Sequence, residues 1–377
     1  MRAFHNRTGA ARRIFDVAAA IFTRAFGIRI GCHSTLRCNI IPGDSRTKKK
    51  REVDGRSGAR RANGPVVNKE MPFSYAELEE FYEGLVARAR RRGIACAITS
   101  GMACVAFGVS AATKDCDLLC SPDSAGELLS LLGEAALGGR LPNYRGNLTP
   151  PLDARWFRGG WTSHFLWPPA GSGAYLDIFG VAPRSSSPWE SEIQGFYASP
   201  HTVAEMKRTN RDKDWPFVTA LGARMIEMGD ERGWLHIYDE NLLHAFGDTA
   251  KYSAHLFKRR PILELAANND PRLRPALRAE VEYWHELDRV RMSVYENAVR
   301  QYMVEVRKSR LPPSAGLPDQ HNLRVRCAEK YLPISPLRDY GVDRMISETR
   351  ETLAQIIHPD AMGWLPDVHE HFKLLSA

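Results

Sequence analysis

The sequence has few cysteines, and none of them forms a closely spaced pair. The seven cysteines are an odd number, include no CxxC, and mostly stand in apolar segments. A disulfide framework uses an even set in an oxidising compartment, and a zinc site needs neighbouring ligands. We therefore expect buried free thiols and a reducing, cytoplasmic location. His369 and His371 in "VHEHF" lack further ligands nearby, so we expect both at the surface.

The chain also lacks an apolar run long enough to cross a membrane. A spanning helix needs about 20 apolar residues, and the run near the start is interrupted by Arg24 and Arg29. We expect a soluble protein without a membrane segment. A length of 377 residues, with 44% apolar and 25% charged residues, allows two or three ordinary globular domains.

Acidic residues are scarce at the start of the chain. Residues 1–65 hold fifteen Lys and Arg against four Asp and Glu, so that stretch carries a net charge of +11. The whole chain carries +8, which leaves −3 for everything after Pro65. The high isoelectric point therefore belongs to a leader, and the slightly acidic body argues against a large RNA-binding surface.

The leader, residues 1–70, has three possible roles. Its Arg-rich amphipathic start is typical of an organellar transit peptide, and a basic arm could also hold RNA or an anionic membrane surface. The third possibility is that it has no functional role, because "MPFSYAELEEF" at Met71 is a clean beginning for a domain. We favour this last interpretation, and we expect the polar basic run before Met71 to be disordered.

From Met71 onward, short helices and strands alternate. Ser74 and Glu77 form a capping box before an amphipathic helix, and "GWTSHFLW" and "AYLDIFGV" predict a hairpin. The order predicts a small α+β domain with a mixed sheet and flanking helices. We expect this domain over residues 71–190 and a helical domain over 191–377, built on the long apolar stripe that starts near Leu277.

Two aspartates stand one residue apart in the predicted strand "DCDLLC". Residues i and i+2 of a strand point to the same face, so Asp115 and Asp117 project together while Cys116 and Leu118 face the other side. Adjacent carboxylates repel unless a cation lies between them, and Mg²⁺ is the usual partner of such pairs. Solvent-exposed turn aspartates are the ordinary alternative.

A third carboxylate, Asp177, interrupts the apolar strand "AYLDIFG". A buried acid needs a partner. If its strand neighbours that of Asp115 and Asp117, three carboxylates converge as in two-metal phosphoryl or nucleotidyl transfer. Thr113 and Lys114 would then steady a triphosphate, and the turn at Ser100 and Gly101 would offer backbone N–H groups to it.

These residues resemble a known motif. "TSGMACVAFGVSAATKDCDLL" is similar to the first motif of the nucleotidyltransferase superfamily shared with polymerase-β-like enzymes, and its Thr-Lys-Asp-x-Asp form is similar to the abortive-infection toxin-like branch. The family keeps its third carboxylate where Asp177 stands. The chain departs from the family at the turn, which has Ser100-Gly101 where relatives often have Gly-Gly or Gly-Ser.

Downstream, "EMKRTNRDKDWPF" matches the Lys…Arg-x-x-Asp motif of the same branch. Lys207, Arg211 and Asp214 are spaced i, i+4 and i+7, which is one face of a helix if the helix is continuous. The two cations would then neutralise the phosphates of an NTP, with Asp214 orienting one of them. Because Pro216 favours a new helix near Trp215, Asp214 is equally well interpreted as a helix cap.

The resemblance implies an α+β fold of the nucleotidyltransferase type, a small mixed sheet with flanking helices, and the activity of a metal-dependent nucleotidyltransferase. Asp115, Asp117 and Asp177 would hold Mg²⁺ or Mn²⁺, and a nucleoside monophosphate would pass from an NTP to an acceptor hydroxyl with release of pyrophosphate. A tRNA end, a protein hydroxyl or a small molecule such as an aminoglycoside could be the acceptor. Two alternatives are a non-catalytic member that binds nucleotide or a partner such as an antitoxin, and a phosphohydrolase that releases inorganic phosphate.

Overall fold

Apart from two short strands near the start of the chain, the described residues begin at Phe73. The structure is a computed structural model. It describes residues 73–113, 115–169, 174–247, 253–309, 311–312 and 314–376, together with strands β1 (Arg29–Ile30) and β2 (Ile40–Ile41), which pair antiparallel. The remainder of the leader, the expected domain start at Met71, and Lys114 lie outside the described residues.

Helix α2 (Tyr75–Arg91) begins with the predicted capping box. The Ser74 hydroxyl accepts the backbone N–H of Glu77, and the Glu77 carboxylate accepts the backbone N–H of Ser74 at 2.7 Å. These contacts satisfy two N–H groups that a helix start leaves unpaired. The helix therefore starts at the residue that the sequence predicts, and its Leu78, Tyr82 and Leu85 face the core.

A seven-stranded mixed sheet forms the centre of the first half. Its strands follow the order β5-β6-β7-β4-β3-β9-β8. Strands β4 and β7 pair parallel, as do β3 and β9, and the other neighbours pair antiparallel. The predicted hairpin is confirmed as β6 and β7. The strands are β3 (Cys96–Thr99), β4 (Asp115–Cys120), β5 (Asn143–Tyr144), β6 (Thr162–Leu166), β7 (Tyr175–Phe179), β8 (Ile193–Gln194) and β9 (Tyr197–Ala198).

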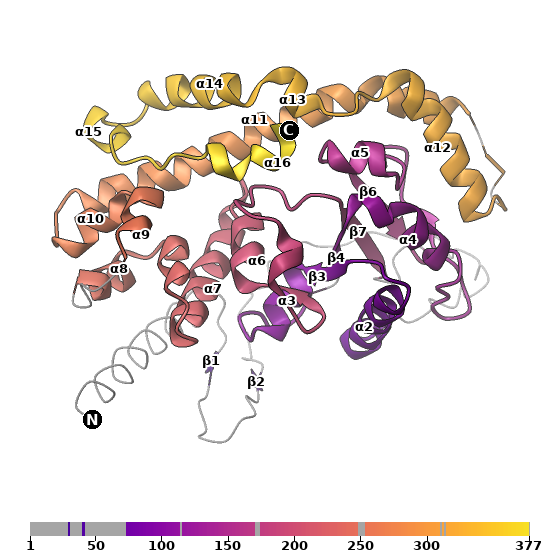
Figure 1. The fold of residues 1–377 in the computed structure, drawn as a ribbon, viewed down its shortest axis with the longest axis horizontal. Coiled ribbons are helices and arrows are strands. Elements are labelled where there is room, and N and C mark those ends of the chain that lie inside the picture. Colours follow the sequence, from indigo (N-terminus) through magenta and orange to yellow (C-terminus); the bar gives the residue numbers. More distant parts are fainter. Residues whose placement is uncertain are drawn as a thin grey trace, which may run out of the picture.

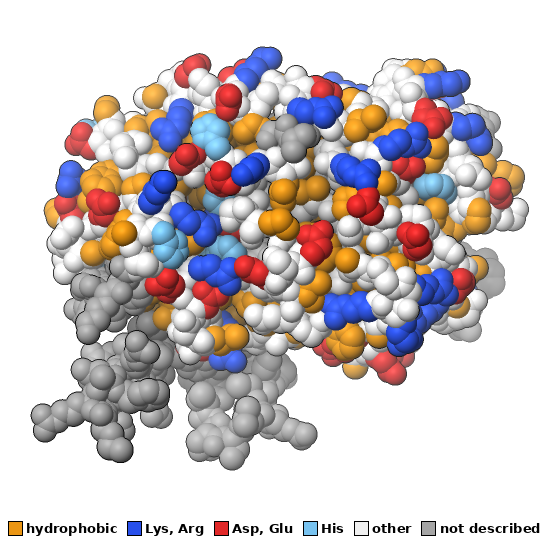
Figure 2. Space-filling view, viewed as in Figure 1, with side chains coloured by type: hydrophobic (Ala, Val, Ile, Leu, Met, Phe, Trp, Pro, Cys, Tyr) orange, Lys and Arg blue, Asp and Glu red, His pale blue; other side chains and the backbone are white. Residues whose placement is uncertain are grey.

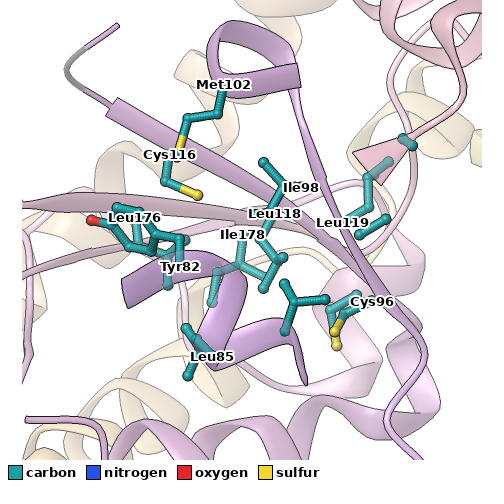
Figure 3. Close-up of a cluster of buried hydrophobic side chains, with 14 of the residues drawn as sticks. Tyr82, Leu85, Cys96, Ile98, Met102, Cys116, Leu118, Leu119, Leu176 and Ile178 are labelled. Carbon is teal, nitrogen blue, oxygen red and sulfur yellow. The ribbon is translucent and has the colours of Figure 1, made fainter. Parts of the chain in front are cut away.

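One face of this sheet is packed with apolar side chains. Cys116 and Leu118 of β4 and Leu176 and Ile178 of β7 gather over Tyr82 and Leu85 of α2 in Figure 3. Alternation along each strand then sends the intervening residues to the opposite face. The cysteine prediction is confirmed for the five that the structure describes, which are all buried free thiols: Cys96, Cys104, Cys116, Cys120 and Cys327.

Helices surround the sheet and build the second half of the molecule (Figure 1). The helices up to the long one are α3 (Ser100–Ala106), η1 (Pro122–Ser124), α4 (Ala125–Leu132), α5 (Ala154–Arg158), η2 (Trp189–Glu192), α6 (Pro200–Met206), η3 (Asp212–Asp214), α7 (Trp215–Glu227), η4 (Glu231–His236), α8 (Glu240–Gly247), α9 (Ala254–Arg259) and α10 (Ile262–Ala267). The others are α11 (Leu273–Lys308), α12 (Leu317–Tyr331), α13 (Pro336–Tyr340), α14 (Val342–Ala354), α15 (Pro359–Met362), η5 (His369–His371) and α16 (Lys373–Ser376). The described chain is therefore a mixed α+β structure.

The long helix α11 runs along one side of the molecule (Figure 1). Its 36 residues span about 54 Å, and it carries much of the predicted apolar stripe on its buried side, although Met292 is exposed. The helix meets the sheet unit through Asp288, whose carboxylate pairs with the buried Arg184 guanidinium and accepts the backbone N–H of Asn210 at 3.1 Å. Strands β8 and β9 follow residue 190 in the chain and still belong to the sheet.

The described surface carries charges of both signs. Acidic and basic side chains are interspersed over the face in Figure 2. No described helix combines the length and the apolar character that crossing a membrane requires. The expectation for the C-terminal histidines is half wrong. His369 is exposed, but His371 is 9% exposed and its Nδ1 donates to the carbonyl oxygen of Arg184 at 2.9 Å.

Gly159 lies close against the backbone of Ile334 and Ser335 in the helical half. A Cβ atom there would lie 1.7 Å from the carbonyl oxygen of Ile334, although its φ of −81° suits any residue. We predict that Gly159→Ala lowers the free energy of unfolding by about 1–3 kcal/mol through overpacking, measured by urea denaturation.

The matched control is Gly84→Ala in the middle of α2, where a Cβ meets nothing within 4 Å. It should raise stability by about 0.5–1 kcal/mol, because alanine is the better helix former. If both variants changed stability alike, the close backbone contact at Gly159 would not limit that position.

Candidate active site

Four polar side chains form a row across the sheet, one from each of four neighbouring strands. Thr99 of β3 is the register partner of Asp117 of β4, Asp117 is the partner of Asp177 of β7, and Asp177 is the partner of His164 of β6. Directly opposed residues of paired strands share one face. The sheet therefore brings Asp117 and Asp177 together on the face opposite to α2.

Asp177 already has two nitrogen partners. Nη2 of Arg145 donates to both of its carboxylate oxygens, at 2.7 and 3.0 Å, and Nδ1 of His164 lies 2.8 Å from Oδ1. The Arg145 guanidinium also stands 5.3 Å from the ring centre of Tyr175. One nitrogen of Arg145 thus contacts both oxygens of the Asp177 carboxylate. The guanidinium therefore places a positive charge directly beside this acid.

The position of Arg145 depends on helix α12. Gln320 Oε1 accepts the backbone N–H of Tyr144 at 3.0 Å, and Arg324 Nη2 donates to the carbonyl oxygen of Gly146 at 2.8 Å. These two contacts hold the residues on either side of Arg145. The C-terminal helices therefore contribute to the site by fixing the edge of the sheet.

Asp117 lies in the least favourable electrostatic position of the row. Burial, reinforced by the charge of Asp177, raises the pKa of Asp117 to about 6, although a hydrogen bond from Ser100 and the charge of Lys207 oppose the shift. Like charges held side by side favour protonation of one of them. The site therefore favours a cation or a proton at Asp117.

Asp115 is more exposed and lies at the start of β4. Its backbone carbonyl accepts the Thr113 hydroxyl at 3.4 Å, and a Cβ on Gly101 would lie 2.5 Å from that same hydroxyl oxygen. The turn, Thr113 and the first aspartate thus lie next to one another, as the sequence predicted.

Ser100 adopts a φ of +54°, in the left-handed region that favours glycine. In the motif that this stretch of sequence resembles, glycine often stands at this position. Here a serine takes the left-handed conformation and donates its hydroxyl to Asp117.

The downstream motif does not lie on one helix. Helix α6 ends at Met206, a loop carries Arg211, and η3 leads into α7 at Trp215. The alternative prediction is correct about the new helix but wrong about capping, because the Asp214 side chain caps nothing. It accepts Thr209 Oγ1 at 2.6 Å and Arg211 Nε at 2.8 Å, and it lies 3.9 Å from Lys207 Nζ.

Lys207 and Arg211 differ sharply in exposure. The Lys207 side chain is 10% exposed and its charge acts on Asp117, whereas the Arg211 side chain is 55% exposed. Asp214 is buried between them. Lys207 therefore belongs with the aspartate row, and Arg211 stands at its margin.

Sequence reasoning missed Arg145 and His164. The alternating pattern of "TSHFL" could have placed His164 on the face of Thr162, but it could not name the neighbouring strand. Arg145 follows a two-residue strand and carries no periodic signal at all.

Within the described residues, no group of three His, Cys, Asp or Glu side chains is gathered closely enough to hold a metal ion. No protein-family model, curated protein or solved structure matches this chain.

The raised pKa of Asp117 gives the protein a pH-dependent stability. Between about pH 4 and pH 6 the folded state keeps a proton that the unfolded state, with a pKa of 3.8, has released. We predict that the contribution of Asp117 to stability is largest below this range and falls by on the order of 2–3 kcal/mol as the pH rises through it, measured by urea denaturation in EDTA.

Asp117→Asn should remove this fall and be more stable than the wild type at pH 7. Asp339→Asn, at a side chain that is 57% exposed, serves as the control and should keep the wild-type profile. An unchanged profile in Asp117→Asn would show that this carboxylate titrates normally.

Proposed function

We propose that this chain is a metal-dependent nucleotidyltransferase that moves a nucleoside monophosphate from an NTP to an acceptor hydroxyl and releases pyrophosphate. The observation that carries the proposal is the parallel register of β4 and β7, with Asp117 opposite Asp177 and Asp115 two residues away on the same strand face. The motif resemblance of the sequence agrees with it.

Carboxylate oxygens are the ligand type that a hard divalent cation takes, although Asp115, Asp117 and Asp177 are not gathered closely enough in this structure to form a three-carboxylate metal site. Mg²⁺ and Mn²⁺ bind carboxylate oxygens, usually one or two from the protein together with substrate phosphates. Burial and, after it, the charge of Asp177 raise the pKa of Asp117, and a bound cation would oppose both effects by favouring the charged carboxylate. The Arg145 guanidinium on Asp177 supplies a stand-in charge and would have to share or release that carboxylate.

The residues would divide the work as follows. Asp115 and Asp117 would hold the metal, and Asp177 would complete the site. The buried Lys207 ammonium, with Arg211 at the margin, would pair with the triphosphate, and Ser100, Gly101 and Thr113 would border it. The Asp214 carboxylate accepts hydrogen bonds from Thr209 and Arg211, and through the second of these it would keep Arg211 in position. Lys114 has the same proposed role as Thr113.

In the reaction, the acceptor oxygen would form a bond to the α-phosphorus as the bond from that phosphorus to the bridging oxygen breaks. The electron pair leaves with pyrophosphate, and the hydroxyl proton passes to the Asp177 carboxylate. The bound metal would supply positive charge to the oxygens of the reacting phosphate. Arg145 and His164, in contact with Asp177, would hold that carboxylate in position.

The direct test incubates the full-length chain with Mg²⁺ or Mn²⁺ and each NTP labelled at the α-phosphate. Total tRNA, the protein itself and a pool of small molecules serve as acceptors. We predict label transfer that falls to background in Asp117→Asn and in Asp177→Asn, because each removes a carboxylate of the row. Release of inorganic phosphate instead would indicate a phosphohydrolase, and metal-dependent NTP binding without transfer would favour a binding protein.

Lys207 provides a second test of the proposal. We predict that Lys207→Met raises the KM for NTP by about 10–100-fold, since it removes one charged contact to phosphate. Lys213→Met is the control because Lys213 is close in sequence but exposed in η3. Equal KM values for the two variants would contradict a triphosphate role for Lys207.

Arg145 offers a test that needs no acceptor. We predict that Arg145→Ala binds Mn²⁺ about tenfold more tightly than the wild type, because it frees Asp177 from a competing cation. Calorimetric titration measures this, with Arg158→Ala at a 57% exposed position as control. Weaker binding in Arg145→Ala would show that the guanidinium supports the site instead of competing for it.

A further inference from the structure

A second cluster of charged groups lies inside the molecule, apart from the row formed by Thr99, Asp117, Asp177 and His164. A small cavity there has room for one particle of about the size of water. None of its lining residues belongs to the candidate active site. The polar members of its wall are Arg208, Arg259, Arg260, Glu280, Trp284 and His371.

Three N–H groups of this wall have no hydrogen-bond partner. They are Nε of Arg208, Nη2 of Arg260 and Nε1 of Trp284, on residues that are 3%, 2% and 1% exposed. A buried donor without a partner is costly, and native proteins rarely leave one. All three groups are donors, so the missing partner must be an acceptor.

The charges around the cavity do not balance locally. Arg260 pairs with Glu280 at 3.0 Å, and Arg259 lies 3.4 Å from Glu205. Arg208 forms no ion pair with a described carboxylate, although its charge acts on the more distant Glu205. Its Nη2 donates to the carbonyl oxygen of Leu235 and to Nδ1 of His236, both at 3.0 Å and both uncharged. A buried cation without a counter-charge is expensive.

The neighbouring histidines carry no negative charge that could neutralise Arg208, and they do not bring a carboxylate into contact with it. His236 Nε2 donates to His201 Nδ1 at 2.8 Å, and His201 Nε2 faces Glu205 at 3.5 Å, so a chain of neutral rings separates Arg208 from that carboxylate. Burial lowers the pKa of His236 and of His201, which keeps both rings neutral. Of the carboxylates, Glu280 lines the cavity, but it is already engaged by Arg260 and by the Tyr238 hydroxyl.

We propose that the cavity binds one monatomic anion of the chloride class, held by Arg208, Arg260 and Trp284. Such an ion accepts all three orphaned donors and supplies the negative charge that Arg208 lacks. A water molecule has two lone pairs for three donors and brings no charge. Phosphate or sulfate is too large for the space. The ion would join the end of α6 to α11 and to the segment between α9 and α10.

The test measures thermal unfolding of the full-length chain in chloride and in gluconate at constant ionic strength. An ion that binds only the folded state raises the unfolding midpoint with concentration. We expect a rise of about 2–4 °C in chloride, bromide acting alike, and anomalous scattering from bromide in the cavity of a crystal grown with it.

Two variants separate the proposal from a general salt effect. Trp284→Phe removes one donor, and its midpoint should need about tenfold more chloride to reach the same rise. Trp167→Phe is the matched control, because Trp167 is equally buried but its Nε1 donates to the carbonyl oxygen of Ala135. Trp167→Phe should keep the wild-type chloride dependence. Equal midpoints in chloride and gluconate, with no bromide in the cavity, would overturn the proposal and identify the occupant as water.

Discussion

The parallel pairing of β4 with β7 is the constraint on which the rest of the sheet unit depends. Cys116 and Leu118 on one strand and Leu176 and Ile178 on the other must face α2 together, because only that register buries them. A slip of one residue would turn Asp177 into the apolar core. The contacts that stabilise the sheet thus also hold the two carboxylates opposite each other.

Placing these two carboxylates side by side costs electrostatic free energy, and separate neighbouring groups offset it at each aspartate. Asp177 receives Arg145 and His164, while Asp117 receives the Ser100 hydroxyl and the field of Lys207. Asp117 remains the less well compensated of the two. The buried cluster around Arg208 has the opposite imbalance, with three N–H groups that have no hydrogen-bond partner and a cation whose hydrogen-bond partners among the described residues are uncharged. At both places buried polar or charged groups lack full compensation from their neighbours, which is costly to the stability of the folded state.

Local patterns in the sequence were sufficient for the elements and for the facing of the aspartates. The capping box at Ser74, the hairpin of β6 and β7, and the shared face of Asp115 and Asp117 all depend on residues close in sequence. The sequence could not tell that β4 pairs with β7 in parallel, since that pairing joins segments some sixty residues apart. Arg145 and the burial of His371 were missed for the same reason, because each depends on a distant partner, α12 in one case and Arg184 in the other.

The hydrogen bonds from α12 to the edge of the sheet limit which changes to the helical half the site can tolerate. Gln320 and Arg324 hold the backbone on both sides of Arg145, so the helical half takes part in shaping the carboxylate row. The two halves are therefore not interchangeable modules. Grafting the sheet unit onto another helical partner, or trimming the chain before Leu317, would release Arg145 from Asp177 and alter the charge of the row without touching any aspartate.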